Sequence, residues 1–217
     1  MATAAEVLDN VLFRLEEDTD DPVFWSREEL LILLNEGYIE FVLMSGYLQS
    51  QSNYQMIGSK MQATPDNCMG LLGVQWQSKP IEKTTIEGFD ESNRRWDYLN
   101  GYLSQWAPCG LDRWFCNATP QLAFTVNLIT LDQPAELAED DEIELEAEYI
   151  KALEDYTFSC ARFKEGGGEF QQGQESYDDF ASKAGMREQK TFSELFALWA
   201  RDPNADTGGG YSTLDRS

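Results

Sequence analysis

Residues 27–43 carry the pattern that most constrains the fold of this chain. Ser26 and Glu29 make a capping box at its start, and Trp25 is placed to pack against Leu30. Apolar side chains then recur around almost the whole helix, which leaves one narrow polar stripe: Glu28, Glu29, Asn35, Glu36 and Glu40. A helix that is apolar on nearly all sides must be covered by other elements, so we expect residues 27–43 to lie at the centre of the core.

A shorter amphipathic helix is expected before this one. Thr3 and Glu6 form a second capping box, and apolar residues recur at helical spacing from Ala4 to Leu15. An acidic loop that ends at Pro22 then separates the two predicted helices.

The helical period disappears at about Gln49, and β-forming residues alternate with turn residues as far as residue 131. One hairpin is expected to join residues 69–76 to 81–87, and a second to join 113–117 to 122–128 around Thr119-Pro120. We therefore interpret residues 51–131 as a β-rich insertion.

Helical spacing returns at Tyr149 and ends at the glycines 166–168, and a partner helix is expected from Phe170 to about Gly185. A short glycine-rich turn between two helices favours an antiparallel pair. Beyond it, Thr191 and Glu194 form another capping box that opens a helix with one apolar stripe: Phe192, Leu195, Phe196 and Trp199.

These patterns predict a mainly α fold. Its helical bundle would consist of two N-terminal helices in residues 1–50 and a C-terminal antiparallel helix pair in residues 132–188. The β-rich insertion would interrupt the bundle, and residues 189–217 would form a docking helix and an extended tail. An apolar stripe on such a terminal helix is suited to binding another protein.

Charge argues against several classes of partner. The chain has 16 basic and 39 acidic residues, a formal net charge of −23, which opposes binding to nucleic acid or to anionic lipid. Residues 1–50 and 132–155 carry −9 and −10 of this charge, whereas residues 51–131 carry only −1. The uneven distribution indicates that different surfaces have different roles.

No pattern in the sequence predicts catalysis. The chain has no histidine, which removes Ser-His and Cys-His nucleophile pairs and most zinc sites. The acidic loop lacks the order of ligands that an EF-hand requires, and the four cysteines are expected to be reduced thiols. We expect no catalytic residue, no cofactor, no metal site and no membrane-spanning segment.

The N-terminal segments Phe24–Leu30, Leu34–Tyr38 and Ser45–Leu48 resemble the helical signature of head-to-tail adaptor (connector) proteins of tailed bacteriophages. On the C-terminal side, Leu131–Pro134 and Tyr149–Tyr156, with a second helix around Tyr177–Phe180, are similar to the helix pair of the same family. The resemblance covers residues 1–50 and 130–188. The insertion matches only in its β-rich character.

This resemblance implies a non-enzymatic virion protein that is assembled in the host cytoplasm. Its copies would form a ring, usually of twelve, that joins the portal protein to a tail or nozzle protein and lets DNA pass without binding it specifically. The stripe of Phe192, Leu195, Phe196 and Trp199 would grip the portal, or would fold back onto its own bundle. An acidic lining would keep DNA from adhering in the channel, with these candidate residues: Glu139, Asp140, Asp141, Glu142, Glu144 and Glu146.

Three alternatives remain open at this point. The chain could be another virion interaction protein, or an acidic mimic of DNA. It could also be a carbohydrate-binding tail component, because the β-rich segment contains four aromatic side chains that can stack on sugars: Trp76, Trp96, Trp106 and Trp114.

Overall fold

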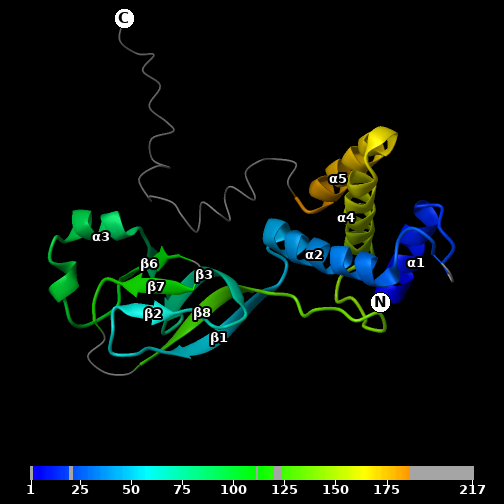
Figure 1. The fold of residues 1–217 in the computed structure, drawn as a ribbon. Helices are drawn as coiled ribbons and strands as arrows, with labels where there is room; N and C mark the ends of the chain where they lie inside the picture. Colours follow the sequence, from blue (N-terminus) through cyan, green and yellow to red (C-terminus); the bar gives the residue numbers. More distant parts are fainter. Residues whose placement is uncertain (1, 20–21, 111, 120–123, 186–217) are drawn as a thin grey trace, which may run out of the picture. The chain divides into compact units, whose positions relative to one another are not determined.

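A computed structural model describes residues 2–19, 22–110, 112–119 and 124–185 of the chain (Figure 1). The described residues divide into two compact units. We call residues 2–47 with 133–185 the helical unit, and residues 48–132 the β unit.

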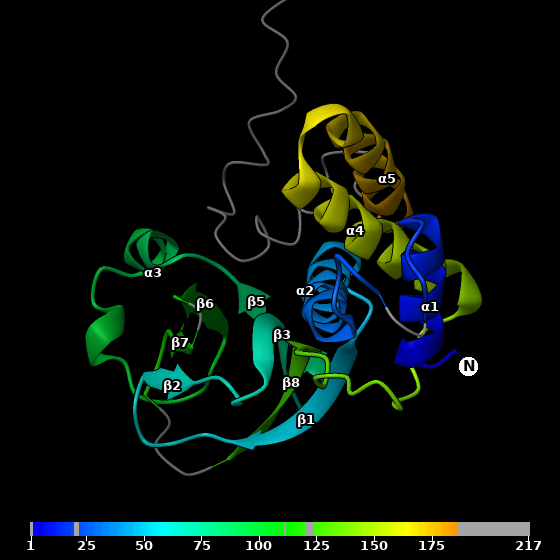
Figure 2. The ribbon, with the colours of Figure 1, turned by 45° about the vertical axis from the view of Figure 1, so that its right-hand side comes forward.

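The helical unit is built from α1 (Ala4–Arg14), α2 (Arg27–Ser45), α4 (Ala147–Glu165) and α5 (Phe170–Lys183), with a short 3-10 turn, Gly167–Glu169, before α5. Helix α4 contacts each of the other three helices (Figures 1 and 2). It is thus the central helix of this unit.

The starts of α1 and α2 confirm the predicted capping boxes. Thr3 and Glu6 exchange hydrogen bonds at the start of α1, and Ser26 and Glu29 do so at the start of α2. Helix α2 ends at Gly46, whose φ of 65° lies in the left-handed region that suits glycine. Trp25 is buried, and its Nε1 donates a hydrogen bond of 2.8 Å to Glu165 at the end of α4.

The predicted helix pair is confirmed as α4 and α5. Phe163 packs against Phe170 with 5.1 Å between ring centroids, and Tyr156 packs against Phe180 at 4.9 Å. The later residue of α4, Phe163, meets the earlier residue of α5, and the earlier residue of α4, Tyr156, meets the later one. The two helices therefore run antiparallel.

One carboxylate ties three helices together. Asp155 on α4 is 3% exposed and accepts a 2.9 Å bond from Arg14 on α1. It also pairs with Lys183 on α5, and Lys151 lies 3.7 Å away. Buried charges need such partners, so this cluster fixes the alignment of α1, α4 and α5.

The β unit contains two four-stranded sheets, ordered β1-β8-β3-β4 and β2-β7-β6-β5. Every pairing is antiparallel except that of β5 with β6. Helix α3 (Ile86–Ser92) and a 3-10 turn (Trp96–Tyr98) lie between β5 and β6 in the sequence. The strands are β1 (Gln49–Gln55), β2 (Met61–Ala63), β3 (Cys68–Trp76), β4 (Lys79–Pro80), β5 (Glu82–Lys83), β6 (Gln105–Cys109), β7 (Arg113–Cys116) and β8 (Thr125–Asp132).

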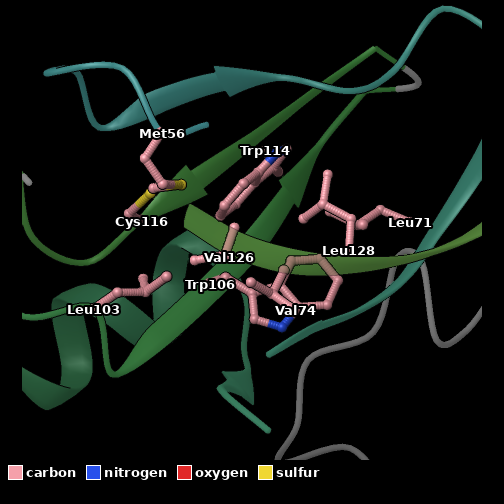
Figure 3. Packing of buried hydrophobic residues seen from close by; sticks show 9 residues of the cluster. All are labelled: Met56, Leu71, Val74, Leu103, Trp106, Trp114, Cys116, Val126 and Leu128. Carbon is pink, nitrogen blue, oxygen red and sulfur yellow. The ribbon is translucent and has the colours of Figure 1, made fainter. Parts of the chain in front are cut away.

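This unit has a hydrophobic core of its own. Trp106 and Trp114 are 1% and 0% exposed, and their rings meet edge to face at 6.4 Å (Figure 3). Strands of both sheets contribute to the cluster, which consists of Met56, Leu71, Val74, Leu103, Trp106, Trp114, Cys116, Val126 and Leu128. Burial in this cluster raises the pKa of the Cys116 thiol to about 12.

The prediction of a mainly α fold is wrong. Helices account for 43% of the structure and strands for 25%, so the fold is mixed α and β. The physical reason is that residues 48–132 bury large aromatic side chains between two sheets. They are therefore a second folded unit, and not a minor addition to a set of helices.

Strand pairing also differs from the prediction in both hairpins. The first is only partly right: β3 turns back at Gln77 and Ser78, whose φ angles of 51° and 62° suit a tight turn, but it pairs with β4 and not with residues 81–87. Of those residues, Glu82–Lys83 form β5 in the other sheet, and Ile86 begins α3. The second predicted hairpin is wrong, because β7 pairs with β6 and β2 whereas β8 pairs with β1 and β3. No helix in the described part of the chain has the length and apolarity needed to cross a membrane.

Candidate functional site

The predicted docking stripe, Phe192, Leu195, Phe196 and Trp199, lies outside the described residues. The predicted acidic lining lies in the segment that joins β8 to α4. Its six residues are Glu139, Asp140, Asp141, Glu142, Glu144 and Glu146, and the structure gives them two different environments.

The first part of this segment is attached to α1 and α2. Glu139 accepts a 3.1 Å bond from Arg27, which also contacts Asp9 at 2.6 Å. These two carboxylates raise the pKa of Arg27, with the hydrogen bond to Asp9 as the largest cause. The backbone oxygens of Glu139 and Asp141 accept bonds from the first N–H groups of α1. Glu139 and Asp141 are thus engaged within the unit.

The second part of the segment alternates between buried and exposed side chains. Ile143 and Leu145 are buried, whereas Glu142, Glu144 and Glu146 are exposed. The alternation of an extended chain therefore turns these three carboxylates to the same, outward side. Whether they line a channel stays a prediction.

An open hollow of about 760 Å³ adjoins these carboxylates. Glu144 and Glu146 form part of its lining, together with apolar and aromatic side chains from both ends of the unit. The other lining residues are Ala2, Tyr47, Leu145, Ala147 and Ile150. We call this feature the acidic hollow.

Aromatic rings support one side of the acidic hollow. Tyr47, which is 40% exposed, packs against Tyr149 at 5.7 Å and against Phe41 at 6.3 Å. The nearby Glu148 carboxylate is the main cause of a raised pKa at Tyr149. Aromatic faces beside carboxylates attract cations, above all guanidinium groups, which can stack and form ion pairs at once.

The carboxylates of the hollow have no cationic partner in the described part of the chain. All six Lys and Arg residues of residues 2–47 and 133–185 form ion pairs with other carboxylates of the same unit. Residues 1–47 and 133–185 contain 26 acidic and 6 basic residues, a formal charge of −20. Residues 48–132 contain 8 acidic and 6 basic residues, a charge of only −2.

The β unit exposes a cationic and aromatic loop between α3 and β6, residues 93–102, which we call the arginine loop. Arg94 and Arg95 are exposed, and among the described residues neither side chain forms an ion pair. Tyr98 and Tyr102 are 79% and 78% exposed. Sequence reasoning overlooked this loop because it counted the charge of the segment as a whole.

The four tryptophans of the β unit fall into two groups. Trp106 and Trp114 belong to the buried core, and Trp96 packs against Phe89 at 4.8 Å. Only Trp76 lies next to an exposed ring, with Tyr102 stacked on it at 5.4 Å. A sugar-binding surface would have to be this pair.

Lys83 is the one residue of the described chain whose buried amine lacks a hydrogen-bond partner. Its Nζ lies 5.2 Å from the centre of the Trp106 ring, and burial lowers its pKa to about 8. An amine in this state is a possible nucleophile, but no carboxylate or hydroxyl contacts it to form a catalytic pair in the described residues.

Replacing this lysine should stabilise the β unit. Below pH 8 the folded state must bury an ammonium group that is fully hydrated in the unfolded state. Allowing for its partial exposure, we expect Lys83→Met to raise the free energy of unfolding by about 1–2 kcal/mol at pH 7. The folded pKa is lowered, so wild-type stability rises between pH 8 and about 10.5, and the advantage of Lys83→Met should shrink over that range. Urea unfolding of both proteins at pH 7 and at pH 10.5 measures this advantage. An advantage that does not change between the two pH values contradicts the prediction.

In the part of the chain that the structure describes, no group of three His, Cys, Asp or Glu side chains could hold a metal ion. Comparison of the sequence with models of protein families found no match, and neither did comparison with curated proteins.

Proposed function

We propose that this protein is a non-enzymatic head-to-tail adaptor of a tailed bacteriophage, whose copies form a ring between the portal and the tail or nozzle. The main support is that the two sequence segments with adaptor character, although separated by the whole β unit, fold together into one compact helical unit. Helix α4 from the second segment packs against α1 and α2 from the first.

The charge of the helical unit gives further support. A ring through which DNA passes benefits from negative side chains, since repulsion keeps the duplex from adhering during packaging and ejection. Residues 1–47 and 133–185 carry a formal charge of −20, and Asp140 and Glu142 are exposed in the segment that joins β8 to α4. This surplus of negative charge is suited to that role.

Immunogold electron microscopy of purified particles tests the proposal. An antibody against the folded protein should label the single vertex that bears the tail, and particles assembled without the chain should show no label there. Label over the whole capsid, or no label on particles, would refute the adaptor function. Label on tail fibres would favour the carbohydrate-binding alternative, for which Trp76 and Tyr102 offer the stacked aromatic pair.

A further inference from the structure

We propose that the arginine loop of one copy of this chain inserts into the acidic hollow of a second copy. The contact would join neighbouring subunits, and it rests on the proposed function in that it supplies the subunit interface of the ring. The partner on each side is this chain itself.

Each surface lacks what the other provides. Glu144 and Glu146 are exposed on the same side of an extended segment, and every described cation of the helical unit is already paired elsewhere. Arg94 and Arg95 are exposed without an ionic partner among the described residues. Their two guanidinium groups can each pair with one of these carboxylates.

Asp97 is the one acidic residue of the arginine loop, and Asp90 and Glu91 lie just before the loop at the end of α3. Asp90 accepts a 2.8 Å bond from the Trp96 indole, and Asp97 lies close enough to Lys60 to act on its pKa. Both carboxylates are thus directed toward groups of their own unit. The arginines remain the groups that the loop offers to a partner.

The two surfaces also match in apolar character. The acidic hollow is open and has an apolar lining of Leu145, Ala147 and Ile150 beside the Tyr47 ring. Tyr98, whose amide donates a 3.0 Å bond to the Arg95 oxygen, is 79% exposed, and Leu99 is 38% exposed. An exposed aromatic side chain that follows two arginines in the chain therefore matches an apolar hollow with two carboxylates in its lining.

Loop and hollow are different surfaces of one chain, so the contact is head-to-tail. A pair of copies therefore keeps one free hollow and one free loop, at opposite ends, for further neighbours. Such heterologous contacts generate a ring when the rotation between neighbours closes. A contact of this type is what a ring-forming subunit requires.

Charge reversal with mixing tests the contact. One variant carries Arg94→Glu with Arg95→Glu, and the other carries Glu144→Arg with Glu146→Arg. Each variant alone opposes like charges, so self-association measured by analytical ultracentrifugation should weaken by about 100-fold or more relative to wild type. Mixed in equal amounts, each loop meets a hollow of opposite charge, and association should return to the wild-type level.

A matched control separates the effect of a change in net charge from the effect of losing the contact. Asp178→Arg with Asp179→Arg alters the charge of the helical unit by the same amount as the hollow variant, at exposed positions on α5. This control should associate as the wild type does, and circular dichroism should show every variant folded under the conditions of the association measurement.

Several outcomes would overturn the inference. One is that either charge-reversal variant alone associates like wild type. Another is that the mixture of the two variants stays dissociated while wild type assembles. A third is that the wild-type chain is monomeric at every concentration. Each of these leaves the adaptor function to be decided by labelling of the tail vertex. If the tail vertex is not labelled but the mixture of the two variants associates like wild type, the adaptor function is refuted and the contact between copies stands.

Discussion

Substituting alanine at Gly37 should lower the free energy of unfolding of the helical unit by about 2–3 kcal/mol. Gly37 lies in the middle of α2, and a Cβ atom there would lie 2.5 Å from Cδ1 and 2.9 Å from Cγ of Tyr156 on α4. The ring cannot move away easily, because Phe180 and Tyr177 of α5 pack against it at 4.9 and 6.3 Å. Alanine would otherwise favour the helix by about 1 kcal/mol, so the steric cost must exceed that gain.

Urea unfolding followed by circular dichroism at 222 nm measures this loss. Gly168→Ala is the matched control, because a Cβ at Gly168 meets nothing within 4 Å, and its stability should stay close to that of wild type. In a Tyr156→Ala background the obstacle is gone, and Gly37→Ala should become neutral or stabilising. An equal loss in both backgrounds would show that the close approach of α2 to α4 is not the cause.

Replacing Asp155 by asparagine should lower the free energy of unfolding of the helical unit by about 2–4 kcal/mol. Three cations would lose their common carboxylate: Arg14 on α1, Lys151 on α4 and Lys183 on α5. Asparagine keeps the size of the side chain, so the loss reports charge and hydrogen bonding rather than a cavity. The cost stays below that of a fully buried pair because the Arg14 and Lys183 side chains are 27% and 34% exposed and can regain water.

Hydrogen exchange locates the effect of Asp155→Asn. Protection should fall in α1 and α5, which the carboxylate connects to α4, while the β unit keeps its protection. Asp179→Asn on the exposed side of α5 is the control and should change stability by less than about 0.5 kcal/mol. A loss no greater than that of the control would mean that apolar packing alone aligns the three helices.

Local signals in the sequence predicted the helices well. The capping boxes at Thr3 and Ser26 involve residues three positions apart, and the glycines after Glu165 end a helix by their own conformational freedom. The sequence also predicted that α2 lies in the core. Its pattern did not predict that Ile32 is 59% exposed.

Strand pairing could not be read in the same way. The alternation that ends at Leu128 correctly indicates a strand in residues 125–128, which belong to β8, but the partner of β8 is decided by burial across the sheets. Strands β1 and β3, which are far from β8 in sequence, bring Tyr54 and Val74 to a common core with Val126. Such pairing depends on contacts between distant residues, which no local pattern contains.

The sequence pattern predicted only some of the residues that line the acidic hollow. The alternation Glu142-Ile143-Glu144-Leu145-Glu146 is the pattern of an extended segment with one buried face, and it was interpreted as charge alone. The hollow itself also needs Ala2 and Tyr47, which come from the other end of the helical unit and carry no motif. Only the fold brings them together.

The pairing of β1 with β8 has a consequence for how this chain could change over evolution. Gln49 and Leu131 are partners across the sheet, and the Asp132 amide donates a 2.8 Å bond to the Leu48 oxygen, so the chain enters and leaves the β unit at neighbouring points. A segment whose two ends meet can be exchanged for another, or shortened to a tight link, at little cost in loop closure. The β unit is in this sense a separable module, which can diverge outside the arginine loop while the four helices are retained.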